Sequence, residues 1–465
     1  MNKVLKFKIQ SQEPYIIAND FLSNFKTSKL HKSYHNKSLF FYIIIFFYNL
    51  LKYLSAIILK HQKINKNNFK KLNKILLISH LININKLKKK DFYFYKIESL
   101  LKKKNIKFNL IQINHTEAIV PNTINYYMTL NDEIKLLKKL IISFLKLIKI
   151  LFLKKNIKIS FKVKIAILAN HLSNQTAKNL RIPLQILNII ERNSFTLSNL
   201  LIITTYEGYT WEKILFYFLN SQIKKKLNVK ICGYQHAFVS NSNFNFYNLY
   251  NYSFNPDYLF FSGRYLYKKI IKNTDYKNIS FLNLGSSKYS ETFLNFTDNK
   301  MKDNNILFLP SSELNEIKKL LTIIIFLSKK NPEFTFIWRA HPHLNFDFYK
   351  KIKNFPNIKI SKDTLSGDIN SSILAFYSSS SSIIPAIIGG IRPIYINSNL
   401  DDPLEDIKNN WKISIFNYQK ININNYIKYN SLIKNDRNEV ISQFKYYFEK
   451  FKSAKFLSFI NENVY

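Results

Sequence analysis

The chain has 465 residues, enough for two domains that each bury a hydrophobic core. Hydrophobic residues make up 46% and charged residues 21%, a balance that excludes a wholly disordered chain. The formal net charge is +41, but the lysines are spread along the chain and no nucleic-acid-binding motif accompanies them, so we predict no nucleic-acid partner. The charge does predict attraction to anionic partners such as acidic lipids and sugar nucleotides.

Residues 1–70 form a basic, partly hydrophobic lead-in that we predict to be helical. Its first twenty residues are too polar for a signal peptide. The apolar run 39–59 is nearly long enough to cross a bilayer, but Asn49 and Lys52 interrupt it. We expect this run to lie on a membrane surface, and the alternative is a helix buried against the protein's own core.

Residues 130–155 have the pattern of an amphipathic helix, with a stripe of lysines beside a broad Leu/Ile face. We favour burial of the apolar face in the core. The alternative is attachment to anionic lipid headgroups through the lysines. The single cysteine, Cys232, permits neither a disulfide within the chain nor a cysteine-based metal site, and a cytoplasmic location follows as the expectation.

Short apolar runs alternate with helical patterns through the rest of the chain, which predicts parallel sheets with helices on both faces. The expected strands are 75–79, 107–113, 163–168, 200–205 and 229–234 in a first series, and 258–262, 281–284, 306–309, 334–338, 358–360, 374–377 and 393–396 in a second. Two series predict an α/β fold with two Rossmann-like domains that face a cleft, at 71–255 and 256–430. In the remaining segment, 431–465, a last helix at 437–456 is expected to pack back on the first domain.

Two of these strands end on residues suited to binding an anion. The run 334–338 stops on Arg339, His341 and Pro342, and ligands of open α/β sheets bind beyond the carboxyl ends of the strands. The alternative for Arg339 is an ordinary surface ion pair. No GxGxxG or P-loop sequence is present, which disfavours the common dinucleotide and P-loop sites.

Serine side chains follow two other strands. Ser378 to Ser382 come between the run 374–377 and an apolar helix, and hydroxyls with free N–H groups at a helix start favour phosphate. The alternative is a low-complexity loop. Ser311 and Ser312, after the run 306–309, are expected to line the same cleft. These residues together predict a pocket for a phosphorylated, nucleotide-linked substrate.

Five histidines, His80, His115, His171, His236 and His341, lie at or just beyond the ends of apolar runs. Each one alone is more often structural than catalytic. Their spacing is not that of a zinc site, and we predict no metal.

Four motifs in a fixed order resemble those of bacterial surface-carbohydrate (capsule and O-antigen type) biosynthesis proteins with the GT-B fold. They are Tyr206–Lys213, Gly233–His236, Arg339–Pro342 and Tyr377–Ser382. The resemblance covers about residues 70 to 430 in organisation, and the wider group includes His-Pro-containing sialyltransferases and CDP-glycerol phosphotransferases. It implies that the second domain holds a nucleotide-sugar donor, with Arg339, His341 and Pro342 near the nucleotide or diphosphate and Ser379, Ser380 and Ser381 at its phosphate.

Glycosyl transfer needs a base for the acceptor hydroxyl and positive charge for the leaving phosphate. Glu207 is the first candidate base, His236 the second and His115 the third, while a structural ion pair with a lysine is the alternative for Glu207. We therefore expect a metal-independent glycosyltransferase without a cofactor, acting on a surface polysaccharide or lipid-linked acceptor, with an anionic membrane surface as a further expected partner. The alternatives are a polyol-phosphate transferase, a sugar-nucleotide epimerase, or a non-catalytic membrane-associated assembly protein.

Overall fold

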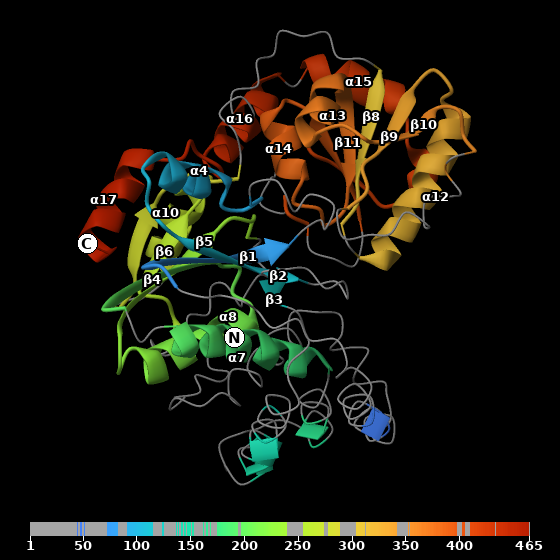
Figure 1. Ribbon diagram of the computed structural model, residues 1–465. Helices are drawn as coiled ribbons and strands as arrows, with labels where there is room; N and C mark the ends of the chain where they lie inside the picture. Colours follow the sequence, from blue (N-terminus) through green and yellow to red (C-terminus); the bar gives the residue numbers. More distant parts are fainter. Residues whose placement is uncertain are drawn as a thin grey trace.

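The computed structural model shows two parallel sheets, each covered by helices on both faces (Figure 1). The structure describes residues 72–81, 91–114, 123–124, 174–193, 197–239, 254–273, 278–288, 304–311, 313–341, 352, 354–397, 402–404, 410–432 and 434–464, together with isolated helical positions between 44 and 51 and between 136 and 168.

The first sheet has seven strands in the order β3-β2-β1-β4-β5-β6-β7, and every neighbouring pair is parallel. Their Leu, Ile and Val runs are nearly continuous because both faces of a parallel sheet are buried. The strands are β1 (Ile75–Leu81), β2 (Asn109–Asn114), β3 (Thr123–Ile124), β4 (Asn199–Thr205), β5 (Asn228–Gln235), β6 (Tyr258–Phe261) and β7 (Ser280–Asn283).

Two cores hold the helices of this sheet. One contains side chains of α7 (Asn174–Asn193), α8 (Thr210–Phe218) and α10 (Arg264–Asn273). The other, on the opposite face, contains side chains of α4 (Tyr95–Lys103) and α17 (Ser453–Val464). Alternate residues of each strand enter alternate cores, as the two-residue period of a strand requires.

The second sheet has six parallel strands in the order β10-β9-β8-β11-β12-β13. They are β8 (Asn305–Leu309), β9 (Thr335–Trp338), β10 (Ile358–Ile360), β11 (Ser372–Tyr377), β12 (Arg392–Ile396) and β13 (Ile413–Ile415). One face packs on α12 (Leu314–Lys330) and α15 (Ile423–Leu432), and the other on α13 (Leu365–Ser371), α14 (Ile383–Ile388) and α16 (Lys434–Lys445).

Both sheets reverse their strand order at one point. Counted from the first strand of each, the orders read 3-2-1-4-5-6, with a seventh strand added to the first sheet. This is the order of the Rossmann fold, whose ligands bind at the carboxyl ends of the strands on either side of the reversal. The predicted fold class, α/β with two Rossmann-like domains, is confirmed. The reversals lie between β1 and β4 and between β8 and β11.

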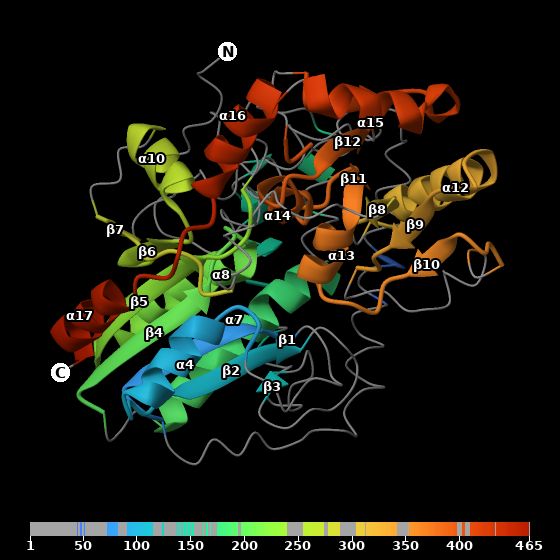
Figure 2. The same ribbon diagram turned by 90° about the horizontal axis from the view of Figure 1, so that it is seen from above.

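The chain returns to the first sheet at its end. After α16, residues 446–452 run beside β6 and β7, where Glu449 N–H donates to Ser262 O (2.8 Å) and Lys452 N–H to Leu284 O (2.7 Å). Figure 2 shows α16 beside the second sheet and α17 beside the first. A single helix over 437–456 is therefore wrong. The chain turns at 446–448, and the stretch 449–452 is not helical because its backbone groups bond to the chain beyond β6 and β7.

Two further expectations about the elements need correction. The division between the sheets falls after β7, not at 255–256, because β6 pairs with β5 and its Leu259 and Phe261 fill the first core. The expected strand at 163–168 is wrong, since the described positions 161, 164, 165 and 168 are helical. Residues 161, 165 and 168 are apolar at helical spacing, a period that competes with the strand reading. Within the described residues, no helix is both long and apolar enough to cross a membrane.

Candidate active site

Glu207 and His236 lie just beyond the neighbouring strands β4 and β5. The strands are in register at Thr205 and Tyr234, so the residues that follow each strand leave the sheet side by side. The Nε2 of His236 is 2.8 Å from Oε1 of Glu207. The His236 side chain is 2% exposed and that of Glu207 25% exposed. Two of the predicted catalytic residues therefore form one carboxylate–imidazole pair.

The loop that carries Glu207 is folded by a second carboxyl group. The fully buried Glu212, in the first turn of α8, accepts the backbone N–H of Glu207 at 3.1 Å and that of Tyr209 at 2.8 Å. Gly208 between them has a φ of +82°, a conformation that glycine adopts at little cost. The result is a tight turn that holds the Glu207 backbone at the end of β4.

The two carboxyl groups have opposite pKa shifts. Burial alone would raise the pKa of Glu207, but hydrogen bonds from His236 and Tyr209, with positive charge from His236 and His80, bring it down to about 2. Burial and the negative charge of Glu207 raise the pKa of Glu212 well above its ordinary value. Environments that separate two pKa values in this way assign different roles to two similar groups. Of these two carboxyl groups, Glu207 is the ionised one.

His236 offers one nitrogen to Glu207 and keeps the other unused. Its Nδ1 is buried and has no hydrogen-bond partner. The nitrogen that donates fixes the tautomer of a neutral imidazole, so a proton on Nε2 leaves the lone pair on Nδ1. A carboxylate that orients an imidazole whose second nitrogen accepts a proton is the arrangement of a general base.

Aromatic rings surround this pair. The ring of Tyr93 packs edge-on against that of His236, with 4.3 Å between the ring centres. The ring of His80, in β1, packs edge-on against Tyr93 and Trp211, with ring centres 6.0 Å and 5.6 Å apart. His80 thus joins the site from the strand on the other side of the strand reversal. The remaining catalytic candidate, His115, lies outside the described residues.

The turn that carries Tyr93 depends on Asp91, which sequence reasoning missed. Asp91 is buried, and it accepts the hydroxyl of Ser79, the side-chain amide of Gln112 (2.9 Å) and the N–H groups of Tyr93 (2.9 Å) and Phe94 (2.7 Å). Burial raises its pKa despite these hydrogen bonds. Asp91 lies four residues before the first residue of α4, and it accepts the N–H groups two and three residues further along the chain. An Asp in such a place is a turn signal that could have identified it.

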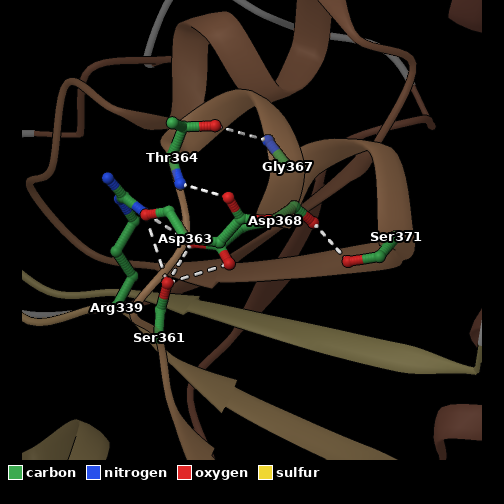
Figure 3. Close-up of polar contacts among 7 residues, drawn as sticks. All are labelled: Arg339, Ser361, Asp363, Thr364, Gly367, Asp368 and Ser371. Atoms are coloured by element: carbon green, nitrogen blue, oxygen red, sulfur yellow. Dashed lines mark hydrogen bonds and ion pairs between the residues drawn. The ribbon is translucent and has the colours of Figure 1, made fainter.

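Three of the predicted donor-binding residues, Arg339, Ser311 and Ser379, follow the adjacent strands β9, β8 and β11. Arg339 is engaged within the protein (Figure 3). Its Nη1 lies 2.5 Å from Oδ2 of the buried Asp368 and donates to the Ser361 hydroxyl (3.3 Å) and the Asp363 carbonyl (3.0 Å). Arg339 therefore does form an ion pair, as the alternative expected, but its partner is buried and not on the surface.

A buried carboxylate also holds two of the serines. Oε2 of Glu316, in α12, accepts the hydroxyls of Ser311 and Ser379, each at 2.6 Å, and Oε1 accepts the N–H of Ser311 at 3.1 Å. A hydroxyl has one proton to donate. While they bond to Glu316, these two serines can accept from a ligand but cannot donate to its phosphate.

The other predicted donor residues lie close by. Ser380 is buried and Ser381 exposed, and their carbonyls accept the N–H groups of Ile383 (3.3 Å) and Ile384 (3.2 Å) at the start of α14. These two helix N–H groups are thus already bonded, contrary to the expectation of a free helix start. His341 is partly exposed beyond β9, and Ser312 and Pro342 lie outside the described residues. In the part of the chain that is described, no three His, Cys, Asp or Glu side chains form a group that could hold a metal ion.

Comparison with known proteins gives likeness of fold only. No protein-family model matches the chain, and no curated protein matches it. Three solved structures illustrate what it is similar to. UDP-GlcNAc 2-epimerase from Methanocaldococcus jannaschii, solved with UDP-GlcNAc and UDP, has 13% identity and a TM-score of 0.45, over 84% of this chain and 99% of that one.

The other two are transferase and polymerase structures. The wall teichoic acid polymerase TagF has 11% identity and a TM-score of 0.42, over 90% of this chain and 98% of that one. The spinosyn rhamnosyltransferase SpnG, complexed with thymidine diphosphate, has 9% identity and a TM-score of 0.47, over 83% and 100%. Identities this low do not align the site residues, so these proteins assign no substrate to this chain.

Proposed function

We propose that this protein is a glycosyltransferase that moves a sugar from a nucleotide-sugar donor to a polysaccharide or glycolipid acceptor. The observation that carries the proposal is the Glu207–His236 pair, which presents an oriented imidazole with an unpartnered Nδ1 beyond the strands of a Rossmann-type sheet. The first domain would hold the acceptor and the second the donor. A strongly basic chain suits both an anionic donor and an acceptor made at a membrane surface.

The pKa of Glu207 reorders the candidate bases. A carboxylate with a pKa of about 2 is a weak base near neutral pH, where a good general base has a pKa close to the working pH. His236 is therefore the base in our proposal, and Glu207 is the residue that orients it. Movement of the Tyr93 ring, which packs against the imidazole, would open the way to Nδ1.

The proposed step is a single displacement. His236 Nδ1 takes the proton of the acceptor hydroxyl as its oxygen bonds to the anomeric carbon. The bond from that carbon to the nucleotide phosphate oxygen breaks, and the nucleotide leaves with the electron pair. Arg339 and His341 would supply positive charge and Ser380 and Ser381 hydroxyls to the leaving phosphate, without a metal. Arg339 can do so while its Nη1 remains on Asp368, because a guanidinium has five N–H donors.

The test separates donor binding from chemistry. Purified protein is screened with UDP-, GDP-, CDP- and CMP-linked sugars for thermal stabilisation, and stabilising donors are then assayed for transfer to glycolipid acceptors with and without EDTA. We expect His341→Ala to weaken stabilisation by the donor, and His236→Ala to preserve it while kcat falls by about 10²–10⁴-fold. Glu207→Gln is expected to lower kcat with little change in donor binding. Stabilisation by no donor, or loss of transfer in EDTA, would contradict the proposal.

A further inference from the structure

The helical segment between 136 and 152 is apolar on two opposite faces. Every described position in it is helical. Leu136, Leu147 and Leu151 are buried, and Leu136 belongs to the core beneath the first sheet. A helix apolar on one face covers a core with that face and normally shows polar residues on the other. This segment does not follow that rule.

The opposite face exposes large hydrophobic side chains beside lysines. Ile141, Ile142, Leu145 and Phe152 are between 39% and 59% exposed. With 3.6 residues per turn, these four side chains and the exposed Lys138 and Lys149 fall within about 100° of arc. Their common direction makes them one surface rather than scattered exposed residues. We call this set of six residues the basic apolar face.

A neighbouring segment extends this face. The ring of Phe161, which is also exposed, contacts that of Phe152 at 5.8 Å, and Lys164 Nζ lies 5.1 Å from the centre of the Phe152 ring. A further set repeats the pattern near the start of the chain. Ile44, Phe47, Tyr48 and Leu51 are spaced as one side of a helix and are 51% to 65% exposed. In Figure 1 both regions lie on the α7 side of the first sheet, away from the second sheet.

We propose that the basic apolar face docks on a bilayer containing anionic lipid, with its hydrophobic side chains entering the headgroup–acyl boundary. More than half of the exposed large hydrophobic side chains in the described residues belong to these two regions. A protein partner would satisfy the apolar side chains, but lysines among them on a chain of charge +41 complement an acidic lipid surface better. Leu136, which packs in the core beneath the first sheet, fastens the segment to the sheet that carries the proposed acceptor site.

Membrane docking rests on the proposed function only for its biological role, which would be to hold the Glu207–His236 pair near a lipid-linked acceptor. The experiment therefore needs no donor. The full chain is sedimented with vesicles of phosphatidylcholine alone and of phosphatidylcholine with 30% phosphatidylglycerol. We expect binding to the mixed vesicles that weakens as salt is added.

Two matched pairs of variants separate insertion from general attraction of a basic protein. Leu145→Ser/Phe152→Ser is expected to lower partitioning about tenfold or more, because it removes apolar side chains from the boundary. Leu314→Ser/Phe416→Ser, at an exposed leucine and an exposed phenylalanine of the second domain, is expected to leave partitioning unchanged. Lys138→Glu/Lys149→Glu is expected to weaken binding more than Lys318→Glu/Lys359→Glu, which changes the net charge equally at exposed lysines of α12 and β10. Thermal melting checks that each variant is folded.

Three results would overturn the inference. Equal partitioning of Leu145→Ser/Phe152→Ser and wild type would show that charge alone attracts the protein. Absence of vesicle binding would exclude a lipid occupant. A dimer that dissociates in the serine variants, without vesicle binding, would assign the face to a second copy of the chain. If a nucleotide-sugar donor stabilised the protein but vesicles did not bind it, the proposed function would stand and membrane docking would be refuted.

Discussion

Ser311 and Ser379 leave neighbouring strands of the second sheet, yet both hydroxyls donate to the same oxygen of Glu316, each at 2.6 Å. These bonds join the loops on the two sides of the strand reversal, between β8 and β11. A buried carboxylate at this place is a structural group first, because it needs these donors when no ligand is bound.

The Glu316 network predicts a graded loss of stability. Ser379→Ala removes one donor and should lower the free energy of unfolding by about 1 kcal/mol, while Glu316→Ala, which leaves both hydroxyls and the Ser311 N–H without their acceptor, should cost about 1–3 kcal/mol. Urea unfolding measures both, and the double variant measures their coupling. Additive losses would show that the hydroxyl and carboxylate do not interact in solution.

Arg339 is expected to contribute to the stability of the fold even when no ligand is bound. Arg339→Ala leaves Asp368 buried without its ion-pair partner and should cost about 3–5 kcal/mol, whereas adding Asp368→Asn should recover part of that loss. Thermal melting of the two variants compares them. Full donor binding by the recovered double variant would remove Arg339 from the proposed donor site.

The pKa of Glu207 predicts an acid-sensitive contribution to stability. Its folded pKa, about 2, lies below the ordinary value of 4.5. A lowered pKa stabilises the fold fully above the unfolded value, and this contribution is lost as the pH falls through the folded value. The difference corresponds to about 3 kcal/mol. Glu207→Gln should therefore reduce the loss of stability between pH 4.5 and pH 2.

Urea unfolding at a series of pH values, with the exposed Glu191→Gln in α7 as the control, measures this difference. If the free energy of unfolding changed with pH in the same way for wild type and Glu207→Gln, His236 and Tyr209 would not hold an ionised Glu207 in the folded state.

Glu212 should behave in the opposite sense. Its pKa is raised, so its contribution to stability is present at low pH and is lost as the pH rises through the folded value. Glu212→Gln keeps an oxygen for the N–H groups of Glu207 and Tyr209 without the ionisation, and its stability relative to wild type should rise with pH. Glu212→Ala should cost about 1–3 kcal/mol because those N–H groups lose their acceptor. Unfolding measured at pH 5 and pH 8 tests both statements.

Gly285 should not tolerate a side chain. A Cβ there would lie 2.1 Å from the carbonyl oxygen of Lys450, and the residue has a φ of +78°. Gly285→Ala should cost about 2–4 kcal/mol, because either the returning chain moves or the glycine leaves its conformation. Ser280→Ala, an exposed position in β7, is the control in thermal melting. Equal stability of the two variants would show that the return segment yields without cost.

The sequence predicted the strands well because parallel strands are buried on both faces and appear as short apolar runs. Eleven of the expected runs overlap strands. The strand β3, with two residues, is too short to stand out, and β13 was not expected. Glu207 and His236 could be proposed from their places at strand ends. Their pairing could not, because it depends on the register of β4 against β5 and on the turn at Gly208.

The carboxylates that bind Arg339 and the two serines in the second domain could not be predicted from the sequence for a related reason. Asp368 lies in α13 and Glu316 in α12, and a carboxylate on a helix is ordinarily solvated. Only the packing of α13 and α12 against the strand ends brings them to Arg339 and the serines. Charge pairing across elements is set by tertiary geometry, and a single sequence carries little signal for it.

The return of the chain through residues 446–452 makes the first domain discontinuous. Its core contains Phe456, Phe459 and Ile460 from α17, the last helix described. During synthesis, the strands β1 to β7 leave the ribosome long before this helix. Helix α4 covers part of the same face of the sheet, but the part that α17 covers stays exposed while the second domain is made. The first domain can be completed only after the second, and a fragment that ends at β7 would keep an apolar face open to aggregation.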